Sequence, residues 1–113
     1  QGGTFAQSIA AASLALQNSL GIICDPIGNR VEAPCLGRNV MAASNALTCA
    51  NMALSNYEHL VPLDQVINTM KAVGDQIHHT LRCTNLGGLC VTPAAKAIET
   101  KLAELELSFF KSC

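Results

Sequence analysis

The sequence predicts an all-α protein of four to five helices, with a cysteine-bearing loop between the first two. In several segments apolar residues recur every three or four positions, which is the spacing of one helix face. Thr4 and the pair Thr92-Pro93 are typical signals for the start of a helix. No alternation of apolar and polar residues is long enough to indicate a strand. We expect the 113 residues to form a single helical domain, residues 1–113.

The first predicted helix covers residues 5–20. Its apolar positions are 5, 9, 12, 16 and 20, which fall on one face. Its many alanine and serine residues would let a neighbouring element approach closely. Thr4 is the expected N-cap of this helix, and Gly21 is the expected residue at its C-terminal end.

A loop is expected over residues 22–37, and a second helix over residues 38–54. The loop contains Pro26, Gly28 and Pro34, which do not fit a continuous helix. The second helix has a regular apolar stripe, which predicts its buried face. That stripe consists of Val40, Ala43, Leu47, Ala50 and Leu54.

Two further helical regions are expected in the second half of the chain. Pro62 suits the first turn of a third helix, Gly74 marks a kink or break, and residues 77–81 could resume the helix. Its expected buried face consists of Val66, Met70 and Val73. A glycine-containing loop over residues 83–90 precedes the last helix, which we expect over residues 93–110.

The composition is apolar and poor in charge. Half of the residues are hydrophobic and 13% are charged, so few charges are left to solvate an outer face. We therefore expect part of the apolar surface to be covered by a larger body. The net charge of −1 gives no basic patch, which argues against nucleic-acid binding. No apolar run has the length of a membrane span, and no signal peptide is indicated, so we expect a cytoplasmic protein.

The six cysteines allow two interpretations, a disulfide framework or a set of thiol ligands. In the reducing cytoplasm, thiols serve more often as ligands or as core residues. Cys24 and Cys35 lie on the short, rigid loop, which suits a soft metal or an iron–sulfur site, with a disulfide loop as the alternative. Cys49 falls within a helical pattern and is expected in the core. The six positions are 24, 35, 49, 83, 90 and 113.

Four pieces of sequence, in this order, resemble one enzyme family. They are Cys24-Asp25-Pro26, Pro34-Cys35, Arg38-Asn39-Val40-Met41 and Gly87-Gly88-Leu89. Together they resemble the C-terminal part of the α domain of iron–sulfur-dependent L-serine dehydratases, also called L-serine ammonia-lyases. The resemblance covers about residues 1–92. The joint pattern is specific, although no single piece is.

The resemblance implies a [4Fe–4S] cluster held by three cysteines, two of which are Cys24 and Cys35. The third is expected upstream of this chain, which would then be a fragment of a larger helical catalytic domain and inactive alone. Cys83 and Cys90 flank the glycine turn and could supply a local thiolate. Cys113 could reach an open iron from the C-terminus. The family does not typically place ligands at Cys49, Cys83 or Cys90.

The resemblance also implies the reaction, which is the deamination of L-serine to pyruvate and ammonia. An iron without a protein ligand would act as a Lewis acid on the serine hydroxyl. No pyridoxal cofactor is implied, and the sequence does not identify the catalytic base. Two alternatives remain open. One is a small non-enzymatic helical interaction domain with structural cysteines, and the other is a related β-eliminating lyase acting on cysteine or another β-substituted amino acid.

Five residues are candidates for binding the substrate carboxylate. Arg38 could bind it bidentately, with Asn39 beside it, although a structural ion pair explains the arginine as well. Thr84, Gly87 and Gly88 could present backbone amides to the same carboxylate, although a tight turn explains the glycines equally well.

Asp25 is favoured as a residue that caps the loop backbone, with a hydrogen bond to a cluster sulfur as the alternative. The expected partners are L-serine and either the missing N-terminal part of the catalytic domain or a partner subunit. A homo-oligomer is also expected.

Overall fold

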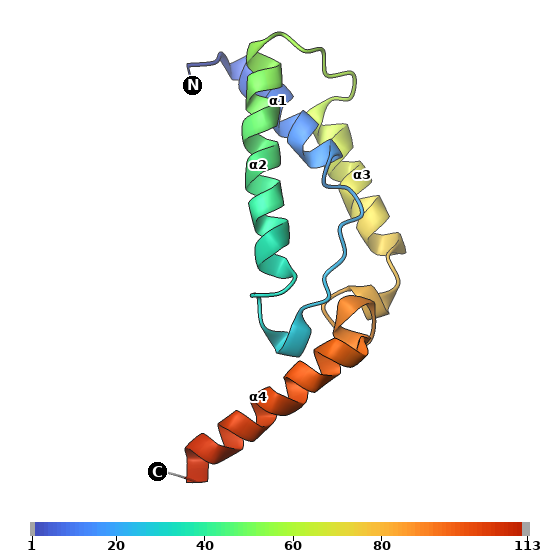
Figure 1. The fold of residues 1–113 in the computed structure, drawn as a ribbon. Coiled ribbons are helices and arrows are strands. Elements are labelled where there is room, and N and C mark those ends of the chain that lie inside the picture. Colours follow the sequence, from blue (N-terminus) through green and yellow to red (C-terminus); the bar gives the residue numbers. More distant parts are fainter. Residues whose placement is uncertain (1, 112–113) are drawn as a thin grey trace. The chain divides into compact units, whose positions relative to one another are not determined.

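The computed structural model describes the backbone of residues 2–111 and the side chains of residues 2–107, so Cys113 lies outside the described residues. The prediction of an all-α fold is confirmed. Within residues 2–111 there is no strand, only an isolated parallel bridge between Cys24 and Arg82. The four α-helices are α1 (Phe5–Gln17), α2 (Cys35–Leu54), α3 (Leu63–Gln76) and α4 (Pro93–Lys111) (Figure 1). Three short 3₁₀ turns are η1 (Ile27–Asn29), η2 (His79–Leu81) and η3 (Gly88–Val91).

The chain forms two compact units. The first contains residues 2–22 and 38–77, and therefore α1, α3 and nearly all of α2. The second contains residues 23–37 and 78–111, and therefore the cysteine loop, the three 3₁₀ turns and α4. The single domain expected over residues 1–113 stays a prediction.

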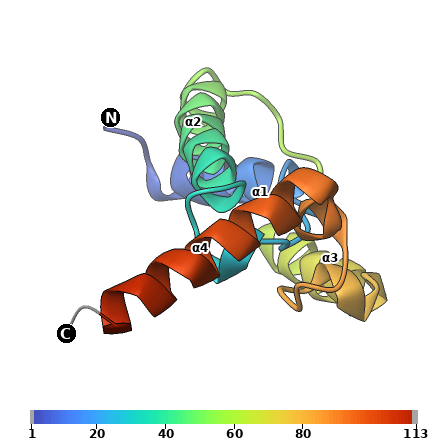
Figure 2. The ribbon, with the colours of Figure 1, turned by 60° about the horizontal axis from the view of Figure 1, so that its bottom comes forward.

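In the first unit, α1 lies between α2 and α3 (Figures 1 and 2). Its start is fixed by a capping box, as the sequence predicts. The Thr4 hydroxyl accepts the N–H of Gln7, and the Gln7 side chain accepts the N–H of Thr4. The helix ends at Gln17 with Asn18 as its C-cap, earlier than the expected end at residue 20. Gly21 stands past this end, in a turn with φ +79°.

The core of the first unit is built from small side chains. Ser13 of α1 is fully buried, and its hydroxyl donates to the carbonyl of Val61 at 2.6 Å. Small residues allow helices to approach closely, so a chain this poor in aromatic residues can still exclude water. The buried side chains of this unit are Ala10, Ser13, Leu14, Cys49, Ala53 and Val66.

The buried face of α2 differs from the predicted stripe. The helix begins at Cys35, so that this cysteine starts a helix instead of lying within the loop. Cys49 and Ala53 are buried, whereas Val40 and Leu47 are 59% and 62% exposed. The contact with α1 is made by Asn45, which donates to the carbonyl of Ala15 and accepts from Asn18. These hydrogen bonds place the face that carries residues 45, 49 and 53 against α1.

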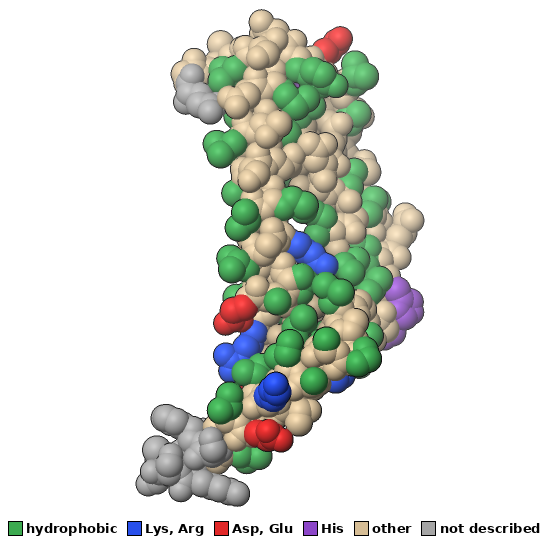
Figure 3. Space-filling view, in the orientation of Figure 1, with side chains coloured by type: hydrophobic (Ala, Val, Ile, Leu, Met, Phe, Trp, Pro, Cys, Tyr) green, Lys and Arg blue, Asp and Glu red, His purple; other side chains and the backbone are tan. Residues whose placement is uncertain are grey.

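Large apolar side chains of α2 are exposed (Figure 3). Leu36, Val40 and Leu47 lie on the side opposite residues 45, 49 and 53, and Met41 is exposed near the start of the helix. None of the helices in the described residues combines the length and the apolar composition needed to span a membrane.

The third helix, α3, differs from its prediction at both ends. Pro62 is its N-cap and does not lie in its first turn. Gly74 does not interrupt the helix, which continues to Gln76. Residues 79–81 then form η2 and do not resume an α-helix. Val66 is buried as predicted, and Met70 and Val73 are half-buried.

Replacing Val66 with alanine is expected to destabilise the first unit by about 2 kcal/mol, because the valine is 2% exposed and its removal leaves a cavity. Ile67 is the matched control on the same helix, because it is 51% exposed and its replacement by alanine should cost under about 0.5 kcal/mol. Chemical unfolding followed by far-ultraviolet circular dichroism measures both. Equal losses would contradict the packing of α3 described here.

Candidate functional site

The cysteine loop closes on itself within the second unit. The Ile27 N–H donates to the carbonyl of Ala33 at 2.9 Å, and the Leu36 N–H donates to the carbonyl of Val31 at 2.8 Å. Gly28 adopts φ +61° inside η1, and its Cα faces the Leu102 side chain of α4, where an added Cβ would come within 3.1 Å. The loop is therefore held by its own backbone and by α4. It brings Cys24 and Cys35 into the same compact unit.

The backbone of Cys24 is fixed by a segment far along the chain. Its N–H donates to the carbonyl of Leu81 at 2.9 Å, and its carbonyl accepts the N–H of Cys83 at 2.6 Å. These two bonds form the isolated parallel bridge between Cys24 and Arg82. Cys83 takes a left-handed conformation there, with φ +62°.

Asp25 connects the Cys-Asp-Pro piece to the Gly-Gly-Leu piece. Its side chain is buried, with 1% exposure, and its Oδ2 accepts the N–H of Leu89 at 2.6 Å. Gly88 lies against the carboxylate so closely that an added Cβ would be 2.3 Å from Oδ2. The expectation that Asp25 caps a backbone is met, but the group it caps is in η3 and not in its own loop.

None of the five described cysteines is part of a disulfide. Cys24 and Cys35 are half-buried, Cys83 is exposed, and Cys49 and Cys90 are buried. The alternative of a disulfide between Cys24 and Cys35 is thus not found. The expected core role of Cys49 is confirmed, since it has no exposed surface.

The donor set suits part of an iron–sulfur site. Half-buried thiols outside any disulfide are the soft ligands that such clusters take. A cluster needs more than two protein thiolates, and in the described part of the chain no three histidine, cysteine, aspartate or glutamate side chains gather in a way that could hold a metal ion.

The candidate carboxylate-binding residues are divided between the two units. Thr84, Gly87 and Gly88 lie with the cysteines in the second unit, whereas Arg38 and Asn39 belong to the first. The Thr84 hydroxyl donates to the carbonyl of His79 at 3.0 Å, so its side chain stabilises the turn. Gly87 lies against Thr80, where an added Cβ would come within 2.9 Å of the hydroxyl. Close packing therefore explains both glycines, Gly87 against Thr80 and Gly88 against Asp25.

A polar hollow of about 280 Å³ lies beside η1 and α4 in the second unit. The Asn85 side chain donates to Asn29 at 2.7 Å there, and Lys96 pairs with Glu99 at 2.8 Å. Two buried oxygens, Asn85 Oδ1 and Glu99 Oε1, have no hydrogen-bond partner among the described residues. Both are acceptors, and the two cations that line the hollow, Arg30 and Lys96, are paired with Glu106 and Glu99. The hollow therefore does not suit the carboxylate of an amino acid.

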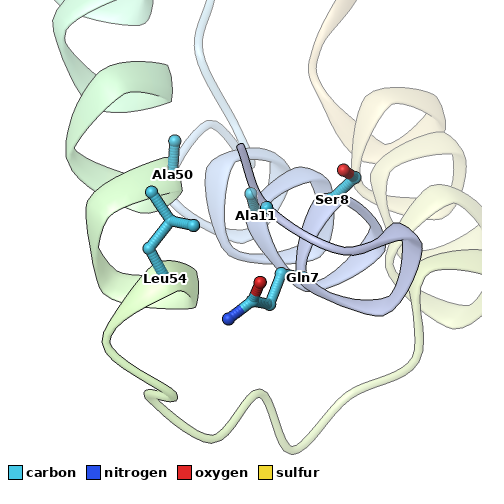
Figure 4. A pocket seen from close by; sticks show the side chains of 6 residues that line it. Gln7, Ser8, Ala11, Ala50 and Leu54 are labelled. Carbon is cyan, nitrogen blue, oxygen red and sulfur yellow. The ribbon is translucent and has the colours of Figure 1, made fainter. Parts of the chain in front are cut away.

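A second hollow, of about 360 Å³, lies in the first unit between α1 and α2 (Figure 4). No acid, base or thiol lines it, so it offers no group for proton transfer or metal binding. Its lining residues are Gly3, Gln7, Ser8, Ala11, Ala50 and Leu54.

Comparison with known proteins agrees with the resemblance carried by the motifs. The family described as serine dehydratase alpha chain matches residues 1–90. The "Probable L-serine dehydratase, alpha chain" of Latilactobacillus sakei is 44% identical over 110 residues, which are 97% of this chain and 53% of that protein. The protein of the same name in Bacillus subtilis is 44% identical over 101 residues, which are 89% of this chain and 34% of that protein.

An "L-serine dehydratase" of Mycobacterium tuberculosis is 43% identical over 99 residues, which are 87% of this chain and 22% of that protein. The chain thus spans about half of the L. sakei relative and a smaller share of the other two. No solved structure matches the chain. With most of its length matched by one family, this chain belongs to the serine dehydratase alpha chain family.

Proposed function

We propose that this chain is the part of an L-serine dehydratase that supplies two thiolate ligands, Cys24 and Cys35, to a [4Fe–4S] cluster. The enzyme converts L-serine to pyruvate and ammonia. The observation that carries the proposal is that the segment matched by the family, residues 1–90, contains both cysteines. Their thiols support it, because both are half-buried outside any disulfide, with Cys24 on the closed loop and Cys35 where that loop enters α2.

When bound, the cluster supplies a Lewis-acidic iron that makes the serine hydroxyl a better leaving group. Two residues of this chain would hold the cluster. They are Cys24, on the backbone bridge, and Cys35, at the N-terminal end of α2. Loss of the α-proton and of the hydroxyl removes one water from serine, and hydrolysis of the resulting enamine takes one water up and releases ammonia. Arg38 and Asn39, or the amides of Gly87 and Gly88, are the groups we propose for the substrate carboxylate.

The remaining ligands and the rest of the active site come, in this proposal, from protein outside residues 1–113. The relatives are longer than this chain, and two of them are named as alpha chains, which supports a partner subunit. A homo-oligomer is a further part of the proposal. A reducing compartment such as the cytoplasm belongs to it as well, because the thiolates must stay reduced.

The test is a chimaeric enzyme. This chain replaces the segment that it matches in the L. sakei relative, and the product is loaded with iron and sulfide without oxygen. We expect L-serine to yield pyruvate and ammonia in equal amounts, and only after loading. D-serine and L-cysteine are assayed alongside, to separate a serine dehydratase from another β-eliminating lyase.

The parent relative, loaded in the same way, is the control. A chimaera that has the parent's helical signal and iron content, but forms no pyruvate from L-serine, would contradict the proposal. Faster turnover of L-cysteine than of L-serine would replace it with the β-eliminating alternative.

A further inference from the structure

We propose that Asp25 is a positioning residue for the Cys24 thiol, which it holds in place before any metal binds. This inference rests on the proposed function, because that function gives the position of Cys24 its purpose. In this role Asp25 is not a ligand and acts through its neighbour.

The first step is the burial of the Asp25 carboxylate. A charged group with 1% exposure is costly to desolvate unless it is well hydrogen-bonded. Its bond to the N–H of Leu89, at 2.6 Å, is short and charge-assisted, which is the stronger kind. The residue pair is separated by 64 positions, so the bond joins the cysteine loop to η3.

The second step is the lack of space around the carboxylate. The Cα of Gly88 is so near that an added Cβ would lie 2.3 Å from Oδ2 and 2.7 Å from the Asp25 Cβ. The close approach of Gly88 and the hydrogen bond from the Leu89 N–H to Oδ2 both restrict the Asp25 side chain. Because Asp25 follows Cys24 directly, this fixes one side of the peptide between them.

The third step is the other side of that peptide. The N–H and the carbonyl of Cys24 are both bonded to the backbone of residues 81–83. Residue 24 is thus held by its main chain on one segment and by the side chain of its neighbour on another. Preorganised ligands are what a metal site requires, and the groups that orient ligands affect metal affinity strongly. We assign this orienting role to Asp25.

The test measures the Cys24 thiol in the iron-free chain, so that it does not depend on cluster loading. The rate of alkylation of each cysteine by iodoacetamide is followed by peptide mass spectrometry. Asparagine fills the same space as aspartate but makes a weaker, neutral hydrogen bond. We expect Asp25→Asn to speed alkylation of Cys24 about threefold and Asp25→Ala about tenfold, since local opening becomes easier.

Two controls separate positioning from general loosening. Cys90 is fully buried in η3, next to Leu89, and reports both opening of η3 and unfolding of the unit. Ala97→Gly is the control for general loosening, because Ala97 is exposed on α4 and glycine weakens the helix through its backbone. We expect Ala97→Gly to leave the ratio of Cys24 to Cys90 alkylation unchanged, and both Asp25 variants to raise it.

An unchanged ratio in Asp25→Asn would overturn the inference, whatever the alanine variant does. A rise of Cys24 and Cys90 alkylation by the same factor, as expected for Ala97→Gly, would overturn it too, because Asp25 would then be a stability residue only. Failure of the proposed function would be seen in a different experiment, the chimaera assay, as a folded and iron-loaded chimaera that forms no pyruvate.

Discussion

Replacing Cys24 or Cys35 with alanine in the iron-loaded chimaera is expected to abolish cluster binding and to lower pyruvate formation at least about a thousandfold. A Lewis-acidic metal supplies several kcal/mol of transition-state stabilisation. A loss of about 4 kcal/mol corresponds to a thousandfold lower rate. Each change removes one of the two thiols that this chain offers from its closed loop. Iron content, the visible absorbance of the cluster and the rate of pyruvate formation measure the effect.

The other cysteines provide matched controls for this prediction. Cys49 and Cys90 are buried, so their replacement by alanine should cost stability but leave iron binding intact. Cys83 is exposed and next to Cys24 across the backbone bridge, which makes Cys83→Ala the stricter control. If Cys83→Ala removes the iron while Cys35→Ala retains it, the ligand assignment made here is wrong.

The local signals in the sequence predicted the helices well. Thr4 and Thr92 cap α1 and α4 as expected, because capping depends on residues within one turn of each other. The buried face of α2 was predicted only in part, since Ala50 and Leu54 are half-buried but Val40 and Leu47 are exposed. Its stripe through Val40 and Leu47 is as regular as a core stripe, but the side of a helix that is buried depends on where its neighbour crosses it.

For the site, the sequence predicted the rigid loop that carries Cys24, because proline and glycine restrict the backbone locally, although Cys35 proved to start α2. It did not predict the bond between Asp25 and Leu89. Both motifs were visible in the sequence, but nothing in either one indicates that they are in contact across 64 positions. The available signal was the glycine pair itself, since an obligatory glycine can mark a place where another group approaches closely.

Replacing Gly88 with alanine is expected to destabilise the second unit by about 3 kcal/mol, through a left-handed backbone and overpacking together. Gly88 has φ +76°, and its added Cβ would collide with Asp25, at 2.3 Å from Oδ2 and 2.8 Å from Cγ. Gly21→Ala is the matched control, because φ is +79° there and the nearest atom, in Val73, is 3.8 Å away. That change should cost only the backbone part, about 1 kcal/mol. Chemical unfolding measures both.

A double variant separates the two causes. In Asp25→Ala with Gly88→Ala, the carboxylate that blocks the new Cβ is gone, so the cost of the glycine change should fall by about half relative to the same change beside an intact Asp25. The alanine at position 25 has its own cost, because it leaves the Leu89 N–H without its partner, and the single variant measures that cost. Strict additivity of the two single changes would mean that Asp25 and Gly88 are not in contact, and that the Cys-Asp-Pro and Gly-Gly-Leu pieces are not joined there.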